Sequence, residues 1–204
     1  MLKNKKLIII NIIVCFLLIT SCYGQNFNAG AIVGINTSQV SGDNLSGFNQ
    51  FGLRIGGFIN KKLKNCNGQI DLQYIQKGSQ SRIDQDTYQE GYKFQLNYIE
   101  IPISIQKEIQ KKTEIELGFA VSYLLGWTET YNAADDYGID VKNIEYSLHF
   151  GIIYSISENL YFNSRISNSI SPIRPHTSGQ TYQWNKGQYN TAISFALLYY
   201  LFKK

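Results

Sequence analysis

The feature that most constrains the fold of this chain is a long alternation between apolar and small or polar residues. In the segment 113–127, TEIELGFAVSYLLGW, every odd position from Ile115 to Leu125 is apolar or aromatic, and the even positions are charged or small except for Leu124. A period of two indicates a β-strand with one apolar face. Strands in soluble proteins average about five or six residues, whereas this run is about twice as long. Its length matches the hydrocarbon thickness of a membrane.

The same alternation recurs along the chain and predicts eight strands. They lie near residues 27–36, 51–60, 69–74, 99–106, 113–127, 145–155, 160–166 and 189–201. Ahead of the fourth strand, Phe94 and Leu96 fall on the opposite parity, which predicts a β-bulge or an inward-facing aromatic residue there. Long connections near 38–50, 79–92, 128–142 and 171–187 alternate with short ones. We therefore predict an all-β fold: an eight-stranded antiparallel up-and-down transmembrane β-barrel, whose short turns and chain ends face the periplasm.

The first two dozen residues differ from the rest and predict export. Three lysines precede an apolar run from Leu7 to Ile19, and small residues follow at Ser21 and Gly24. This is the layout of a secretory signal peptide, and the apolar run is too short for a transmembrane helix. We predict a signal peptide over 1–24 and a barrel domain over 25–204. Cleavage before Gln25 is favoured, and lipoprotein processing at Cys22 stays open as an alternative.

Charge and cysteine content exclude several classes of protein. Without residues 1–24, Lys plus Arg falls from 19 to 16 against 15 acidic residues, so the basic balance belongs mostly to the removed segment. No basic stripe remains to bind nucleic acid. Cys66 is the only cysteine after Gln25, which excludes an internal disulfide framework.

A set of ionisable residues falls on the inward-facing parity of the predicted strands. These residues are Arg54, Asp71, Lys77, Glu100, Glu116, Glu145, His149 and Arg165. Buried charges persist only when they are paired and hydrogen-bonded, so we expect a lumenal charge network with the two arginines as its centres. An eight-stranded barrel is just wide enough to be filled by side chains. The network is therefore interpreted as a plug rather than as an ion path.

Aromatic residues gather near both predicted ends of the strands, as in the two girdles of membrane barrels. The interface aromatics that we predict are Tyr123, Trp127, Trp184, Tyr189, Tyr199 and Phe202. Exposed aromatics can also stack on nucleic-acid bases, but here no interleaved lysine or arginine supports that use.

Candidate sites of chemistry are few. Ser147, His149 and Glu145 share one strand face and raise the alternative of a Ser-His lipid hydrolase, although that face is predicted to be lumenal. Asp135, Asp136 and Asp140 could supply oxygen ligands to calcium, but their spacing does not match a calcium loop. We expect no cofactor, no metal site and no catalytic residues.

The segments NFNAGAIVGINTSQVSGDN, FGLRIGGFI, QIDLQYIQKGSQ, LNYIEIPISIQ and ELGFAVSYLLG resemble, in this order, the outer-membrane β-barrel domain of Bacteroidetes porin-like proteins, the PorT family. The resemblance covers nearly all of the chain after the signal peptide, and QYIQKG and NYIEIP are its most specific motifs. It implies an eight-stranded barrel in the outer membrane of a Gram-negative bacterium. Some members of that family take part in protein secretion, which the resemblance extends to this chain as an expectation.

The sequence therefore predicts a non-enzymatic, monomeric outer-membrane barrel with a plugged lumen. Its partners are outer-membrane lipid and proteins that meet the four long loops, in a structural or interaction role linked to secretion by the family resemblance. A narrow porin for small solutes is the main alternative, and a lipid-modifying hydrolase is the second.

Overall fold

The computed structural model describes residues 27–43, 45, 47–81, 91–131, 134–135, 139–176 and 186–203. The predicted signal peptide, residues 1–24, lies outside the described residues. No helix among the described residues is long and apolar enough to cross a membrane.

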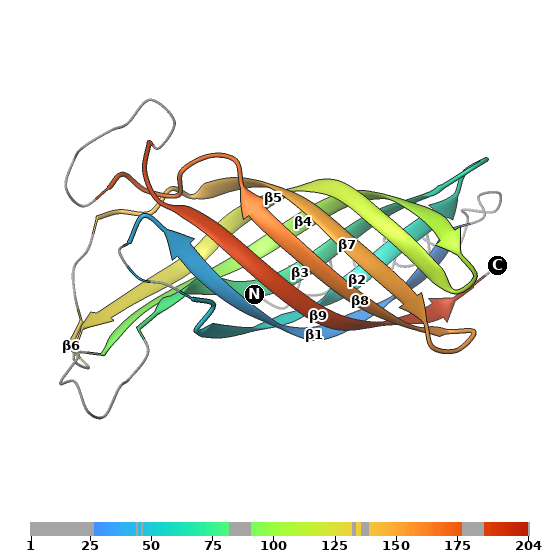
Figure 1. Cartoon of the computed structure of the whole chain (residues 1–204), viewed down its shortest axis with the longest axis horizontal. Helices are drawn as coiled ribbons and strands as arrows, with labels where there is room; N and C mark the ends of the chain where they lie inside the picture. The colour runs from blue at the N-terminus through green and yellow to red at the C-terminus, as the bar shows by residue number, and fades with distance from the viewer. Residues whose placement is uncertain are drawn as a thin grey trace, which may run out of the picture.

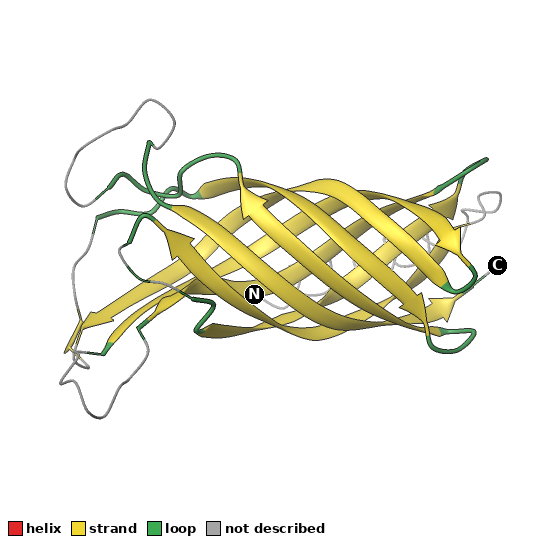
Figure 2. Cartoon of the chain, in the orientation of Figure 1, coloured by secondary structure: helices red, strands yellow, loops and turns green. Residues whose placement is uncertain are grey.

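The described chain is a closed antiparallel barrel (Figures 1 and 2). Its strands are β1 (Phe27–Ser41), β2 (Gln50–Lys62), β3 (Asn67–Gln80), β4 (Tyr92–Gln110), β5 (Thr113–Tyr131), β7 (Ile144–Ser155), β8 (Leu160–Ser169) and β9 (Tyr189–Phe202). The two-residue β6 (Ala134–Asp135) pairs antiparallel with the end of β5. Each barrel strand pairs with the next along the chain, and β9 pairs with β1 to close the sheet. The predicted eight-stranded up-and-down barrel is confirmed.

Closure places the strand connections at two ends. Residues 63–66, 111–112 and 156–159 form the short turns at one end, together with the start of β1 and the end of β9 (Figure 1). Residues 42–49, 81–91, 132–143 and 170–188 connect the strands at the other end. The predicted alternation of long and short connections is therefore present, and it gives the barrel a short-turn end and a long-loop end.

The two faces of the sheet have opposite polarity. Outward-facing positions carry exposed apolar side chains such as Val33, Leu117 and Leu148, whereas inward-facing positions carry buried polar ones. On β5 the outward apolar series runs from Ile115 to Leu125, which is about the length that spans a bilayer. This inverted arrangement suits a barrel whose outer face meets lipid.

A β-bulge breaks the alternation at the long-loop end. The β4–β5 register shifts between Asn97 and Tyr98, so that Tyr98 pairs with Leu124 and Asn97 pairs with Gly126. Leu125 is the extra residue, and beyond it the inward parity of β5 changes from even to odd. Phe94 and Leu96 point inward and are fully buried. Both a bulge and an inward aromatic are therefore present where the sequence predicts one or the other.

The topology predicts which connections are reachable from outside the cell. An epitope tag inserted at Gly47, in a long connection, should bind antibody on intact cells, because long loops of such barrels face outward and short turns face the periplasm. A tag at Asn65, in a short turn, should bind only after the outer membrane is permeabilised. If antibody labelled only the Asn65 tag on intact cells, the short turns would face outward and the predicted orientation would be wrong.

Candidate functional site

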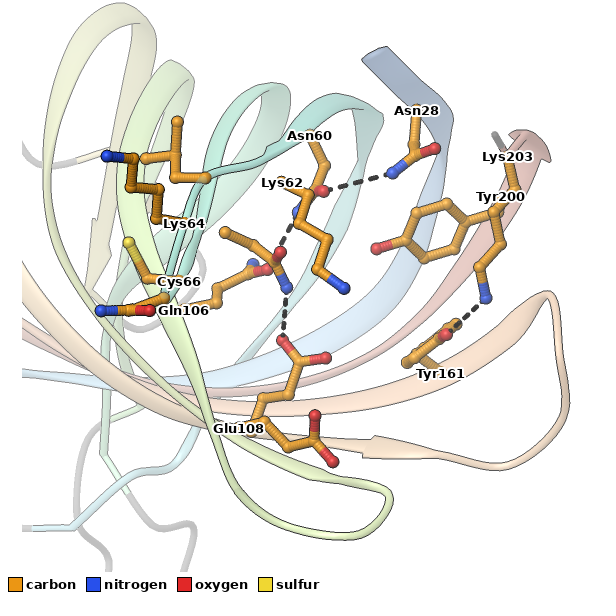
Figure 3. A pocket seen from close by; sticks show the side chains of 14 residues that line it. Asn28, Asn60, Lys62, Lys64, Cys66, Gln106, Glu108, Tyr161, Tyr200 and Lys203 are labelled. Atoms are coloured by element: carbon orange, nitrogen blue, oxygen red, sulfur yellow. Dashed lines mark hydrogen bonds between the residues drawn. The ribbon is translucent and has the colours of Figure 1, made fainter. Parts of the chain in front are cut away.

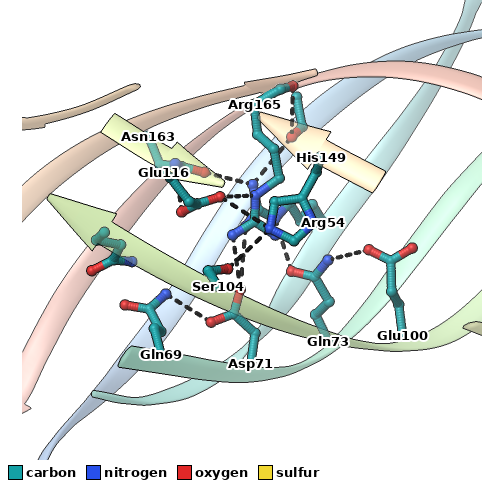
Figure 4. A network of polar contacts seen from close by, with 12 residues as sticks. Arg54, Gln69, Asp71, Gln73, Glu100, Ser104, Glu116, His149, Asn163 and Arg165 are labelled. Atoms are coloured by element: carbon teal, nitrogen blue, oxygen red, sulfur yellow. Dashed lines mark hydrogen bonds and ion pairs between the residues drawn. The ribbon is translucent and has the colours of Figure 1, made fainter. Parts of the chain in front are cut away.

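The centre of the barrel is filled by ion pairs that reach across it (Figure 4). Arg165 on β8 donates from Nε to Glu116 Oε1 at 2.6 Å and from Nη2 to Asp71 Oδ2 at 3.0 Å. Asp71 lies on β3, which is four strands away from β8 around the closed sheet in either direction. The side chains of Arg165 and Asp71 therefore meet across the full width of the lumen.

Arg54 extends this group toward β8 and β9. Its Nε donates to Gln73 at 2.8 Å, and its Nη1 donates to Asn163 at 2.8 Å and to Ser194 at 3.1 Å. Asp71 lies 3.7 Å from Arg54 Nη2. One aspartate thus lies between two arginines, which reduces the cost of burying three charges together.

A second ion group lies nearer the long-loop end. Lys77 Nζ donates to Glu100 at 2.6 Å and to Glu145 at 2.9 Å, and all three side chains are buried. Gln73 donates to the other oxygen of Glu100 at 2.7 Å and accepts from Arg54, so it joins the two groups. The structure therefore brings all the predicted members of the lumenal charge network together.

Two glycines make these contacts possible. Gly118 on β5 lies between His149 on β7 and Ser104 on β4 in the strand register, and a Cβ at this position would lie 2.7 Å from His149 Nε2. Gly151 similarly separates Glu116 from Arg165. The missing side chains leave the space through which their neighbours meet.

The histidine has a different partner from the one that the hydrolase hypothesis requires. His149 Nε2 lies 2.9 Å from Ser104 Oγ and 3.5 Å from Glu116, so both contacts use the same ring nitrogen. The Ser147 hydroxyl is buried with no hydrogen-bond partner among the described residues, and Glu145 contacts Lys77 instead. A triad needs the base to contact the nucleophile through one nitrogen and the carboxylate through the other. The Ser147–His149–Glu145 grouping is therefore wrong.

An apolar group, the loop-end cluster, closes the interior above the ion groups. Two of its members come from connections, Val141 and Ile173, and the others come from strands. The cluster consists of Val40, Ile75, Phe94, Leu96, Tyr98, Leu124, Val141 and Ile173. Val141 and Ile173 therefore hold the described parts of two connections against the strands, and the cluster fills the interior at this level.

The connection 170–188 is held to the barrel by Arg174, which the sequence did not single out. Its Nη1 and Nη2 donate to the two oxygens of Glu129 at 2.6 and 2.9 Å, and its guanidinium carbon lies 4.1 Å from the centre of the Phe94 ring. Tyr92 donates to Glu129 at 2.5 Å. Glu129 faces inward only because the parity of β5 changes at the bulge, so the alternation read from the preceding residues would place it outward. The exception at Leu124 is the one sequence signal of that change.

The Arg174–Glu129 pair should make the docking of this connection depend on pH. Burial alone would raise the pKa of Glu129, but the hydrogen bonds from Arg174 and Tyr92 hold that pKa below the usual glutamate value. A depressed pKa in the folded state contributes stability above the unfolded-state value of about 4.3, and the contribution is lost as pH falls through the folded-state value. In a Trp184→Phe background, the fluorescence of Trp127 should therefore change below about pH 4.

Glu129→Gln is the matched control for this acid transition. The amide has no charge to lose, so its fluorescence should already resemble the acid form and should stay flat between pH 6 and pH 3. An unchanged transition in Glu129→Gln would assign the effect to another carboxylate, such as Asp43.

At the short-turn end, a polar vestibule of about 410 Å³ opens to solvent (Figure 3). Lys62, Glu108 and Lys203 surround it. Its floor is closed by buried amides, with Asn60 donating to Gln106 at 3.0 Å, and Gln69 below them donates to Asp71 at 2.7 Å. The vestibule therefore ends blindly at the charge network.

The predicted interface aromatics occupy different surroundings. Tyr123, Tyr199 and Phe202 are exposed on the outer face, and Tyr189 is partly buried at the start of β9. Trp127 instead packs against the loop-end cluster, with its ring centre 6.1 Å from that of Phe94, because the bulge changes the parity of β5. Trp184 lies outside the described residues.

No group of three or more metal-ligating side chains occurs among the described residues. The proposed calcium ligand Asp136 lies outside them, and so do the side-chain surroundings of Asp135.

Comparison with known proteins identifies the family. A sequence profile of the outer membrane protein beta-barrel domain matches residues 23–174. Neisserial surface protein A (NspA) has a similar structure, with a TM-score of 0.52 and 11% identity over 86% of this chain and 97% of that chain. Ail, the attachment invasion locus protein of Yersinia pestis, gives a TM-score of 0.50 and 8% identity over 87% of this chain and 100% of that one. At these identities the likeness shows a shared fold alone.

No curated protein matches the chain. The family profile nevertheless covers well over half of it. The protein is therefore located in the outer membrane of a Gram-negative bacterium, and the chain belongs to the outer membrane protein beta-barrel domain family.

Proposed function

We propose that this protein is a non-enzymatic, non-conducting outer-membrane barrel that acts as a monomer through its long loops, in a structural or interaction role. The observation that carries the proposal is the set of ion pairs that cross the lumen, above all Arg165–Asp71 between β8 and β3. A conducting pore needs a continuous water path, and these side chains occupy the place where the path would run.

The long-loop end supports an interaction role. Strands β4 and β5 have 19 residues each, whereas a bilayer requires about 9–11. The excess lies at the long-loop end, beyond Leu125. There the sheet carries connections that are anchored by Ile173 and Arg174. Binding residues are often placed on loops held by a rigid scaffold, and a packed barrel is such a scaffold.

A planar-bilayer recording tests the proposal. The purified barrel should give no steady ion current, because the charge network and the loop-end cluster block the lumen. A water-filled porin reconstituted in the same bilayers is the positive control for the recording. A reproducible conductance in the unmutated protein would contradict the closed interior and would favour a narrow porin for small solutes.

The resemblance to the Bacteroidetes PorT family favours one setting for this role. The motifs QYIQKG and NYIEIP that carry the resemblance include Lys77 and Glu100, whose side chains lie inside the barrel. The two motifs thus contribute to the packed interior of the barrel. They support the resemblance to that family, but they do not identify a partner. On this basis we propose a role in protein secretion, to be tested by measuring secreted protein in a deletion strain with and without the intact gene. Unchanged secretion would remove this candidate.

A further inference from the structure

The outer surface of the barrel has a groove over β2, β3 and β4 near the short-turn end. It consists of two adjoining hollows of about 460 and 280 Å³ that share Ile59 and Ile70. We call it the outer groove and define it by Gly57, Ile59, Gly68, Ile70, Ile101 and Ile103. Hollows of this size are in the range of small-molecule sites.

Glycines and an interrupted ladder create the groove. Gly57 and Gly68 occupy outward positions, and a Cβ at Gly57 would meet nothing closer than the Gly30 carbonyl oxygen at 3.4 Å. The β3–β4 pairing is missing between Ile70–Ile103 and Gln73–Glu100. Pro102, which has no backbone N–H to donate, stands in this gap. The outer groove is therefore apolar, and it is hollow because two glycines line it and a backbone pairing is missing.

Lysines stand where the groove reaches the rim. Lys61 lines the hollow nearer the short turns, and its ammonium lies 5.0 Å from the centre of the Phe27 ring. Lys107 is exposed two residues beyond Ile105 on the same face of β4. Lys61 on β2 and Lys107 on β4 are separated by two interstrand spacings of about 4.8 Å each and by two residues along the strand. Both long side chains can therefore reach one headgroup. No carboxylate occupies an outward position of the strands β1–β5 and β7–β9.

The depth of the groove fits one leaflet. Four residues separate Lys61 from Gly57, or about 13 Å along the strand. The whole hydrocarbon core is about 30 Å thick. The groove therefore begins at the periplasmic interface and ends within the periplasmic half of the membrane.

We propose that the outer groove binds an anionic phospholipid of the periplasmic leaflet, with an acyl chain over Gly57 and the phosphate at Lys61 and Lys107. The two lysines at the rim favour an anionic headgroup. The depth of the groove restricts the lipid to the periplasmic leaflet. A second copy of the chain is a poorer occupant, because a twofold dimer over this groove would place its own Lys61 and Lys107 against these lysines.

Native mass spectrometry of the purified protein, with phosphatidylglycerol or phosphatidylcholine added to the detergent, tests the site. The unmutated protein should retain phosphatidylglycerol about 30-fold better, the factor that corresponds to about 1 kcal/mol for each of the two lysines at an anionic surface. Lys61→Gln should lower this preference to about fivefold because Lys107 remains, and Lys61→Gln combined with Lys107→Gln should abolish it. The matched control Lys111→Gln, in the turn 111–112, should keep it. Inorganic phosphate should not displace the lipid.

A second pair of variants tests the acyl-chain position. Gly57→Leu fills the groove and should reduce retention of both lipids, whereas Gly126→Leu, at a glycine with no neighbouring atom within 4 Å of an added Cβ, should not. Heat-dependent migration on gels verifies that each variant is folded. The proposal would be overturned if the unmutated protein retained the two lipids equally or if the control variants lost lipid equally. It would also be overturned if phosphate displaced the lipid, or if the spectra showed a dimer that Gly57→Leu removed.

Discussion

Arg165→Met is expected to lower the free energy of unfolding by about 3–5 kcal/mol, because it leaves carboxylates buried without their cation. Glu116 loses the 2.6 Å bond from Nε, and Asp71 keeps the hydrogen bond from Gln69 but has Arg54 at 3.7 Å as its remaining cation. Both carboxylates are fully buried, so solvent does not screen the loss. Urea titration of the barrel in lipid vesicles, followed by tryptophan fluorescence, measures the change.

The double variant Arg165→Met with Glu116→Gln isolates the interaction energy between these two residues. It should cost less than the sum of the two single changes, since each single change includes the penalty of the partner left behind. Lys111→Met, in an exposed turn, should stay within about 0.5 kcal/mol of the unmutated protein. Additive single changes would mean that Arg165 and Glu116 are not energetically coupled.

Phe119→Arg is expected to cost roughly 2–4 kcal/mol, the range for a basic residue at the middle of the lipid face of a barrel. Phe119 is about half exposed on the outer surface, between Ile103 and Leu148 on the neighbouring strands. In the same vesicle assay the cost should shrink in bilayers with shorter acyl chains, because the charge then lies closer to the interface.

Ala120→Ser is the control on the other face of the same strand. Ala120 is buried inside the barrel and pairs with Ser147, whose hydroxyl has no partner among the described residues. A small hydroxyl there has a polar neighbour and should change stability little. Equal costs for Phe119→Arg and Ala120→Ser would mean that the outer face does not meet lipid.

The strands could be predicted from the sequence because a barrel wall separates two environments along every strand. In β5 from Ile115 to Ser122, each apolar outward residue is followed by a small or charged inward one. The strand ends could not be predicted as well, because beyond the bilayer the alternation no longer reflects lipid on one side. β4 accordingly begins at Tyr92, seven residues before the alternating stretch that starts at Ile99.

The orientation of Trp127 could not be predicted for a related reason. A single extra residue at Leu125 reverses the parity of everything that follows on the strand. Leu124, the one exception to the alternation in the segment 113–127, lies next to this bulge. A single exception does not show whether the residues after it keep the old inward parity or change to the other one. The structure answers this by burying Glu129 with Arg174.

The membership of the charge network followed from parity, whereas its pairings did not. Parity places Arg54 and Asn163 inside, but they meet only because the sheet closes through β1 and β9, which brings β2 within three strands of β8. The His149–Ser104 contact depends on Gly118 between them. Ser147 was the nearer candidate in sequence, yet residues two apart on a strand lie about 7 Å apart along it.

The pairing of β1 with β9 has a consequence for how this chain folds. The first and last strands of the barrel must meet, so the closing contacts have nearly the largest sequence separation that the chain allows, and such contacts form slowly. Until Tyr189–Phe202 is in place, β1 and β8 each present an unpaired edge that can recruit strands from other chains. The interval before closure is therefore when the polypeptide most needs protection from aggregation.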